Sequence, residues 1–345
     1  MATTMVPGRE LLAPPHPTER ISVNEPRVHA RVPFRKSIRK IPSIRNTFTL
    51  AFVCVQIAIV MAAPVLVTQF TAGWAAGARV PALAAVWIAA FLLMGRSHCL
   101  LAILMHEAAH RLLFANRKAN DLTGRWLLAY PTFVPFDAYR GAHLAHHRDE
   151  MGPEEPDLPL YRGYPITRAS MRRKLVRDAT GQTGLKLLKG IWSAARSGSK
   201  EARKVAFSMV GVQIVILLIC ILAGYWWLYP ILWLAPYLTV WRVLNRLRAI
   251  AEHGGMERNR DTRATTHVIR QHPAARFWMV PYCTGWHLAH HVDPGIPFRK
   301  LPVLHEALTA AGYVSDPLVY DSYTQLWAEL ASRDAEAAED SRIVQ

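Results

Sequence analysis

The chain has 345 residues, of which 51% are hydrophobic, and it carries a formal net charge of +16. A mean hydropathy of +0.09 with such a basic excess is typical of a membrane protein whose charges gather at one face. Nucleic-acid binding is the weaker interpretation, because no RNA- or DNA-binding motif accompanies the charge. The four cysteines form no C-x-x-C pair, which argues against a disulfide framework or a thiolate metal site.

The first 46 residues are rich in proline and arginine and contain no apolar span. We expect residues 1–46 to form a basic cytoplasmic segment that is largely disordered up to about residue 35.

Three uncharged apolar stretches follow, at residues 47–70, 80–95 and 205–241. Each is long enough to approach or exceed the hydrocarbon core of a bilayer, about 30 Å. The third is too long for one span, and Gly224 with Pro230 supplies a plausible turn within it. A buried soluble core is the alternative for any one stretch, but three together favour four transmembrane helices in two hairpins.

Lysine and arginine are concentrated in residues 1–46 and 162–204, whereas the links within the two hairpins contain only Arg79. The positive-inside rule therefore places both termini and the central loop in the cytoplasm. We expect a multi-pass integral membrane protein, of a bacterial inner membrane, whose basic loop also attracts anionic headgroups.

Fifteen histidines occur, and eight of them fall in three short boxes, HEAAH at 106–110 and HLAHH at both 143–147 and 287–291. On a helix, residues i, i+3 and i+4 share one face, so each HLAHH box can direct three imidazoles at one point. Neutral imidazole favours zinc, copper, nickel or iron. The predicted metal ligands in these boxes are His106, His110, His143, His146, His147, His287, His290 and His291.

HEAAH also matches the H-E-x-x-H motif of zinc peptidases. Such a site needs three protein ligands and would leave most of the other histidines unexplained. The number of nitrogen ligands instead suits two metals with about four each, and iron is the redox metal that fits dioxygen chemistry. Carboxylate-bridged di-iron bundles use Glu-x-x-His motifs on two facing helices, and the chain does not show that paired pattern.

A ninth histidine, His253, lies in RAIAEHGG at residues 248–255, where the fourth span should emerge into the cytoplasm. We expect His253 to complete the shell of the second metal. The alternative is a histidine at a helix end beside the Gly254–Gly255 stop.

Taken together, HEAAH, YRGAHLAHH with PEEPDLP after it, RAIAEHGG and GWHLAHHVDPGIPFRKLPVLHEAL resemble the membrane fatty acid desaturase and hydroxylase superfamily. The tail HHVDPGIPFRKLP resembles the desaturase branch. The resemblance covers roughly residues 47–315, followed by a cytoplasmic C-terminal tail at 316–345. It implies an all-α integral membrane fold of four spans with a cytoplasmic helical cap that encloses a di-iron site. It also implies dioxygen and two electrons as co-substrates.

The same resemblance sets expectations for partners. The third box begins with His rather than Gln, which argues against a front-end double-bond position. No fused cytochrome b5 or ferredoxin segment is seen, so we expect electrons from a separate ferredoxin, rubredoxin or cytochrome b5-like donor. The basic central loop could dock such a carrier, although a membrane-apposed face explains it equally well.

The reaction and the substrate stay open at this point. An acyl chain on lipid, coenzyme A or acyl carrier protein is the expected substrate, with a small amino-acid-derived metabolite as the alternative. Hydroxylation is the near alternative to desaturation. A non-enzymatic metal-binding protein such as a transporter is the distant one, because the spans are almost free of ionisable residues.

Acidic residues near the boxes are candidates to orient the imidazoles through their second nitrogen. The candidates are Glu107, Asp137, Asp149, Asp157 and Glu252. Glu107 and Glu252 are favoured because they adjoin predicted spans. An ordinary surface or capping role is the alternative for each.

Overall fold

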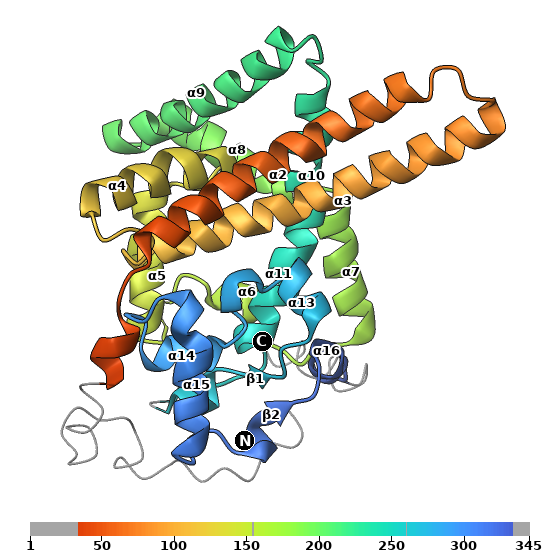
Figure 1. Ribbon diagram of the computed structural model, residues 1–345. Helices are drawn as coiled ribbons and strands as arrows, with labels where there is room; N and C mark the ends of the chain where they lie inside the picture. Colours follow the sequence, from red (N-terminus) through yellow and green to blue (C-terminus); the bar gives the residue numbers. More distant parts are fainter. Residues whose placement is uncertain (1–33, 154, 260, 334–345) are drawn as a thin grey trace.

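The computed structural model describes residues 34–153, 155–259 and 261–333, and the chain is mainly helical (Figure 1). Residues 1–33 of the predicted N-terminal segment and residues 334–345 of the predicted tail lie outside the described residues.

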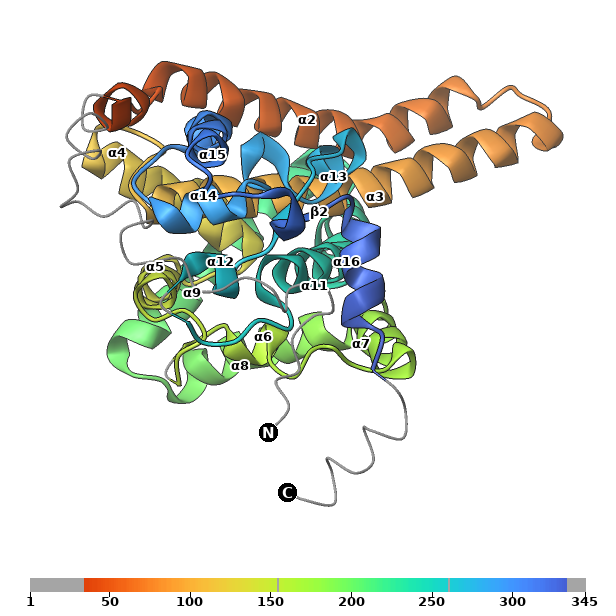
Figure 2. The ribbon, with the colours of Figure 1, turned by 90° about the horizontal axis from the view of Figure 1, so that it is seen from below.

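Three of the described helices are long and apolar enough to cross a membrane. They are α2 (Ser43–Phe70), which continues a short helix at 34–38, α3 (Ala76–Ala109) and α9 (Lys200–Leu222). Phe52, Ile59 and Ile219 are each more than 60% exposed, as expected for side chains that contact hydrocarbon rather than water. Helices α2 and α3 form the first predicted hairpin, whose far end projects beyond the rest of the molecule (Figures 1 and 2).

Helix α3 is the central helix of the fold. Its residues from Cys99 to Ala109 are all buried, whereas its first half alternates between exposed and partly buried positions. It contacts α2 along its length and α11 (Val240–His253) near its buried end. The HEAAH box therefore enters the protein interior at the C-terminal end of a membrane helix.

The fourth predicted span is not a single long helix. It comprises a π-helical turn η4 (Tyr229–Leu234), α10 (Ala235–Leu238) and α11. Pro230 and Pro236 lack the amide hydrogens that a continuous α-helix needs, and Thr239 departs from helical geometry at φ −118° and ψ −81°. Three of the four predicted spans correspond to long apolar helices, and the fourth segment runs as three short helices in series.

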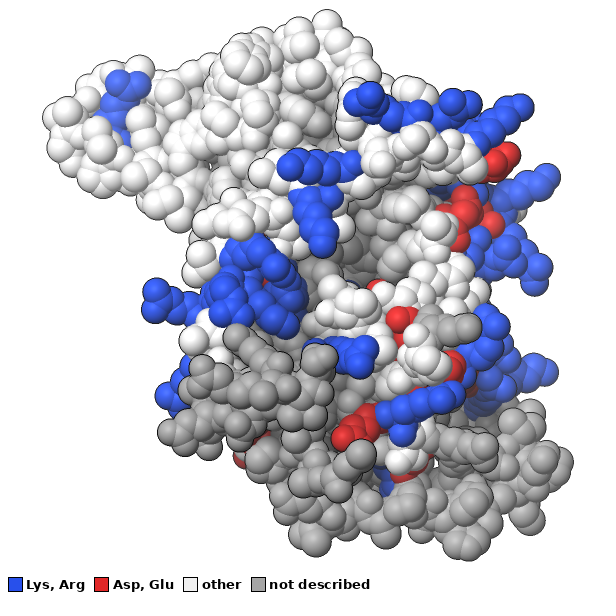
Figure 3. Space-filling model, turned by 180° about the vertical axis from the view of Figure 1, so that it is seen from behind, with Lys and Arg blue, Asp and Glu red and all other residues white. Residues whose placement is uncertain are grey.

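The segment between α3 and α9 forms short helices around the buried end of α3. In order, they are α4 (Arg117–Leu122), the π-helix η2 (Thr123–Ala129), the 3₁₀ turn η3 (Tyr130–Thr132), α5 (Phe136–Arg148), α6 (Leu158–Tyr161), α7 (Arg168–Ala179) and α8 (Gln182–Ser197). Lysine and arginine side chains are spread over the face seen from behind, around a hollow, and acidic side chains there are fewer (Figure 3).

The C-terminal third folds back beneath α2 and α3 (Figure 1). It contains α12 (Thr262–Thr265), β1 (Val268–Ile269), α13 (Pro273–Trp278), η5 (Pro281–Cys283), α14 (His287–Val292), η6 (Phe298–Lys300), α15 (Leu301–Ala310), η7 (Asp316–Leu318), β2 (Val319–Tyr320) and α16 (Tyr323–Leu330). The strands β1 and β2 are parallel, with Val268 opposite Val319. Leu326 and Leu330 are fully buried in a cluster with Ile250 of α11, so residues 316–330 are part of the packed structure.

The distance between α3 and α5 depends on Gly124 in η2. A Cβ atom at this position would lie 2.5 Å from Cζ of Phe136 and 2.9 Å from Cβ of Ala108. Only a residue without a side chain therefore lets η2 pack against both helices.

We expect Gly124→Val to lower the free energy of unfolding by about 1–3 kcal/mol, as overpacking does in other cores. The measurement is the thermal midpoint of the purified protein. Gly141→Ala on α5 is the matched control, because a Cβ there meets nothing within 4 Å and alanine favours a helix over glycine. Equal midpoints for Gly124→Val and the unchanged protein would contradict this packing argument.

Candidate metal centre

The three histidine boxes converge at the buried end of α3. HEAAH occupies the last turn of α3, with His110 directly after it, and the two HLAHH boxes lie on α5 and α14. His253 is the last residue of α11. The structure therefore brings all nine sequence-predicted histidines together from four separate helix ends.

Five of these imidazoles form one group. Their candidate ligand nitrogens all lie within 4.8 Å of one another, and Nε2 of His143 is 2.8 Å from Nε2 of His110 and 3.1 Å from Nε2 of His147. The members of this first group are His106, His110, His143, His147 and His290.

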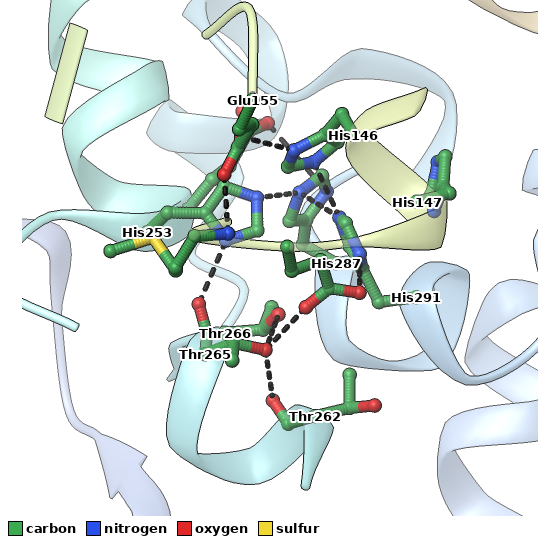
Figure 4. A network of polar contacts seen from close by, with 12 residues as sticks. His146, His147, Glu155, His253, Thr262, Thr265, Thr266, His287 and His291 are labelled. Atoms are coloured by element: carbon green, nitrogen blue, oxygen red, sulfur yellow. Dashed lines mark hydrogen bonds and ion pairs between the residues drawn. The ribbon is translucent and has the colours of Figure 1, made fainter. Parts of the chain in front are cut away.

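The other four imidazoles form a second group beside the first. The ligand nitrogens of His146, His253 and His291 lie within 4.8 Å of one another. His287 joins them, since its Nε2 is 3.1 Å from Nε2 of His253 and 3.0 Å from Nε2 of His291. The rings of His146 and His147, neighbours on α5, contribute to different groups (Figure 4).

In the second group, each Nδ1 atom faces a fixed oxygen. Nδ1 of His146 is 2.5 Å from Oε1 of Glu155, and Nδ1 of His291 is 2.6 Å from Oε1 of Glu150. Nδ1 of His253 donates to the carbonyl oxygen of Thr265 at 2.8 Å (Figure 4). Nδ1 of His287 is 3.7 Å from Oε1 of Glu252. Such contacts orient the rings and hold the proton on Nδ1.

The donor set fits a bound metal cation. A carbonyl oxygen can only accept a hydrogen bond, so Nδ1 of His253 carries the hydrogen and its Nε2 presents a lone pair. That lone pair faces Nε2 of His287 at 3.1 Å, and the Nδ1 atom of His287 lies 3.7 Å from the carboxylate of Glu252. Converging lone pairs repel one another unless a cation lies between them. Nε2 of His290 is also buried without a hydrogen-bond partner among the described residues.

The protonation state agrees with metal binding. Burial holds the pKa of His143, His290 and His291 well below the usual value, and the neighbouring imidazoles lower it further. These rings are therefore neutral near pH 7, which is the form that binds metal.

The C-terminal end of α3 is held by polar side chains around the first group. The carbonyl oxygen of Ala108 accepts from Nδ2 of Asn120 at 2.8 Å and from Nη2 of Arg140 at 3.0 Å. Arg140 also pairs with Asp121 at 2.6 Å. Arg140 lies three residues before His143 on α5. Its hydrogen bonds to Ala108 and Asp121 therefore hold the second box against the first.

The two favoured carboxylates lie in different environments. Glu252 is 3.7 Å from His287 and also accepts from Arg248 at 3.0 Å. The buried Glu107 instead accepts from the backbone N–H of Phe298 at 3.1 Å and makes no hydrogen bond to a histidine in the described part of the chain. Glu107 thus ties the segment after the third box to α3.

The other acidic candidates make no hydrogen bond to an imidazole among the described residues, although the charge of Asp157 helps to raise the pKa of His146. Asp137 pairs with Arg125 at 2.9 Å, Asp149 pairs with Arg258 at 2.8 Å, and Asp157 precedes α6.

Sequence reasoning missed Glu150 and Glu155, which contact histidines directly. The signal for both was the acidic segment that follows the second box, in which five acidic residues occur between His147 and Leu158.

The long apolar helices and the two buried imidazole groups define a membrane protein with a histidine-rich candidate metal centre. Sequence comparison agrees, because the family model described as fatty acid desaturase matches residues 81–323. The chain belongs to this family, within the membrane desaturase and hydroxylase superfamily that the boxes predicted. Dihydrorhizobitoxine desaturase of Bradyrhizobium elkanii is 29% identical over 233 residues. The match covers 63% of this chain and 65% of that relative, just under two thirds of its length.

Proposed function

We propose that the protein is a dioxygen-dependent di-iron desaturase that introduces a carbon–carbon double bond into an acyl chain. The observation that supports this most strongly is the pair of adjacent imidazole groups, five rings and four, buried at the end of α3. Two redox metals side by side suit the two-electron removal of hydrogen. Family membership and a relative named as a desaturase support the same reaction.

In this proposal the first group holds one iron and the second group holds the other. When bound, the irons supply the activation of dioxygen that removes two hydrogen atoms from adjacent carbons. The balanced reaction takes one dioxygen, two electrons and two protons, and yields the alkene and two waters. The protein holds nine imidazoles in place and excludes bulk water from them.

The surrounding groups act as positioning residues. Glu155, Glu150 and the carbonyl of Thr265 each accept from an Nδ1–H, so the corresponding Nε2 atoms keep their direction. Glu252 places a negative charge 3.7 Å from Nδ1 of His287 without a hydrogen bond to it. Glu107 has a different role, since it fixes the backbone at Phe298 and so the loop that leaves the third box.

We further propose a topology of four spans in two hairpins, with η4, α10 and α11 as the fourth. Exposed apolar side chains on α2 and α9 support the membrane assignment. The lysine and arginine distribution supports cytoplasmic termini and a cytoplasmic helical cap around the histidines. The bacterial source of the desaturase relative is the ground for proposing a bacterial inner membrane. Residues 47–315 are then the desaturase domain between the segments 1–46 and 316–345, and residues 316–330 of the last segment pack against that domain.

Electrons reach the site in this proposal from a separate ferredoxin, rubredoxin or cytochrome b5-like carrier. The family points to an acyl chain carried on lipid, coenzyme A or acyl carrier protein. The relative's name, which specifies dihydrorhizobitoxine, keeps a small amino-acid-derived metabolite as the second substrate class.

The test is mass spectrometry of extracts from a host that expresses the protein, with His146→Ala as the inactive control. We expect a product lighter than its precursor by two hydrogen atoms, present only with the unchanged protein. A product heavier by one oxygen atom would instead establish a hydroxylase.

A further inference from the structure

A groove of about 660 Å³ lies outside the histidine groups, between α5, α8, α9 and the start of α11. This volume is within the range of small-molecule sites in proteins. Its walls are overwhelmingly apolar and include Leu187, Ile191, Val205 and Met209. Such a surface accommodates a hydrocarbon chain.

Arg242 is the one lysine or arginine that lines this groove among the described residues. Its Nε donates to the carbonyl oxygen of Tyr237 at 3.2 Å, and its guanidinium lies 4.4 Å from the centre of the Tyr237 ring. In the described part of the chain no carboxylate lies within ion-pair distance of Arg242. A partly buried cation without an anion beside a membrane segment is costly unless a ligand supplies the anion.

The two acidic residues that line the groove do not neutralise Arg242. Both carboxylate oxygens of Asp137 accept from Arg125, at 2.9 Å and 3.1 Å. Glu201 lies in the first turn of α9, where the helix N-terminus stabilises a negative charge. The charge in the groove that has no ion-pair partner among the described residues is therefore the positive charge of Arg242.

Two helices connect this groove with the histidine groups. On α5, Ala138 lines the groove and His143 follows five residues later, a rise of about 7.5 Å. On α11, Arg242 lines the groove and His253 lies eleven residues further, a rise of about 16 Å. A chain anchored at Arg242 is thus within reach of the candidate metal centre.

We propose that this groove binds a long-chain substrate through its own free carboxylate, with Arg242 as the anchoring cation. The inference rests on the proposed function and refines it, because it selects an unesterified acid over a chain esterified to lipid, coenzyme A or carrier protein. A planar guanidinium matches a carboxylate with two parallel hydrogen bonds, which an ester cannot reproduce.

The test measures retention of radiolabelled palmitate by the purified, iron-loaded protein, with methyl palmitate and L-norleucine as competitors. Palmitate should bind saturably, and methyl palmitate should compete about 10- to 100-fold more weakly, the effect expected when a hydrogen-bonded charge is lost. Norleucine, a short zwitterion, should not compete.

Three variants locate the site. Arg242→Gln should weaken palmitate binding about 10- to 100-fold. Gly190→Phe should block the groove without a clash inside the protein, because Gly190 lines the groove and a Cβ there meets nothing within 4 Å. Arg196→Gln, an exposed position of α8 outside the groove, is the matched control and should bind as the unchanged protein does. Iron content and thermal midpoint verify that each variant is folded.

Equal binding of palmitate and its methyl ester would overturn the proposal, as would unchanged palmitate binding by Arg242→Gln or Gly190→Phe. Displacement of palmitate by norleucine would overturn it in favour of a small zwitterion. These binding assays need no turnover. If cells form the double bond but Arg242→Gln binds palmitate as the unchanged protein does, this inference alone is overturned. If Arg242→Gln weakens palmitate binding as expected but no double bond forms in cells, the desaturase reaction alone is overturned.

Discussion

His143→Ala is expected to reduce activity to background and to release iron from the protein. His143 is buried, and its Nε2 lies within 3.1 Å of the Nε2 atoms of both His110 and His147. Removing it takes away the ring at the middle of the first group. The measurements are product formation in extracts and iron content per purified protein.

His305→Ala is the matched control for this experiment. His305 lies on α15, outside both imidazole groups, so its loss should leave iron content and product formation unchanged. Full iron content and full turnover in His143→Ala would show that the first group is not a metal site.

Glu155→Gln is expected to lower iron affinity or activity by about 10- to 100-fold, the effect of losing an oriented carboxylate behind a ligand histidine. The Glu155 side chain is fully buried against His146, 2.5 Å from its Nδ1. Glutamine keeps the shape of the side chain but removes the charge that orients the ring. Iron affinity is measured by titration of the metal-free protein, and activity by product formation.

Asp137→Asn supplies the comparison for Glu155→Gln. Asp137 is also an acidic residue near the second box, but it pairs with Arg125 and not with a histidine. The variant should retain iron affinity. Equal effects of the two substitutions would mean that the acidic residues act through general charge and not through contact with the imidazoles.

Much of this centre could be predicted from the sequence because its ligands occur in short local patterns. In HLAHH the helical repeat alone brings three rings to one side of a helix, and the boxes then resemble one superfamily. His253 was predicted from its position after the fourth apolar segment. The structure brings it to His287 at 3.1 Å between the Nε2 atoms.

Other features could not be read from local patterns. The second box is divided between the two imidazole groups, with His143 and His147 in the first and His146 in the second. This division depends on where α11 and α14 approach α5. Glu107 sits inside HEAAH, yet its partner is the backbone of Phe298, 191 residues later. The series of short helices at 229–253 reflects prolines whose effect on a long apolar run depends on what packs beside them.

The sequence by itself determined the family, the apolar helices and the identity of the clustered histidines, because these follow from composition and from spacing along one helix. Only the tertiary structure decided which rings share a group, which carboxylates orient them, and that Arg242 lines a mainly apolar groove with no ion-pair partner among the described residues. The physical reason is the separation along the chain over which each effect acts. Helical periodicity acts over a few residues, whereas a metal site and a ligand groove are built from segments that meet only when the chain is packed.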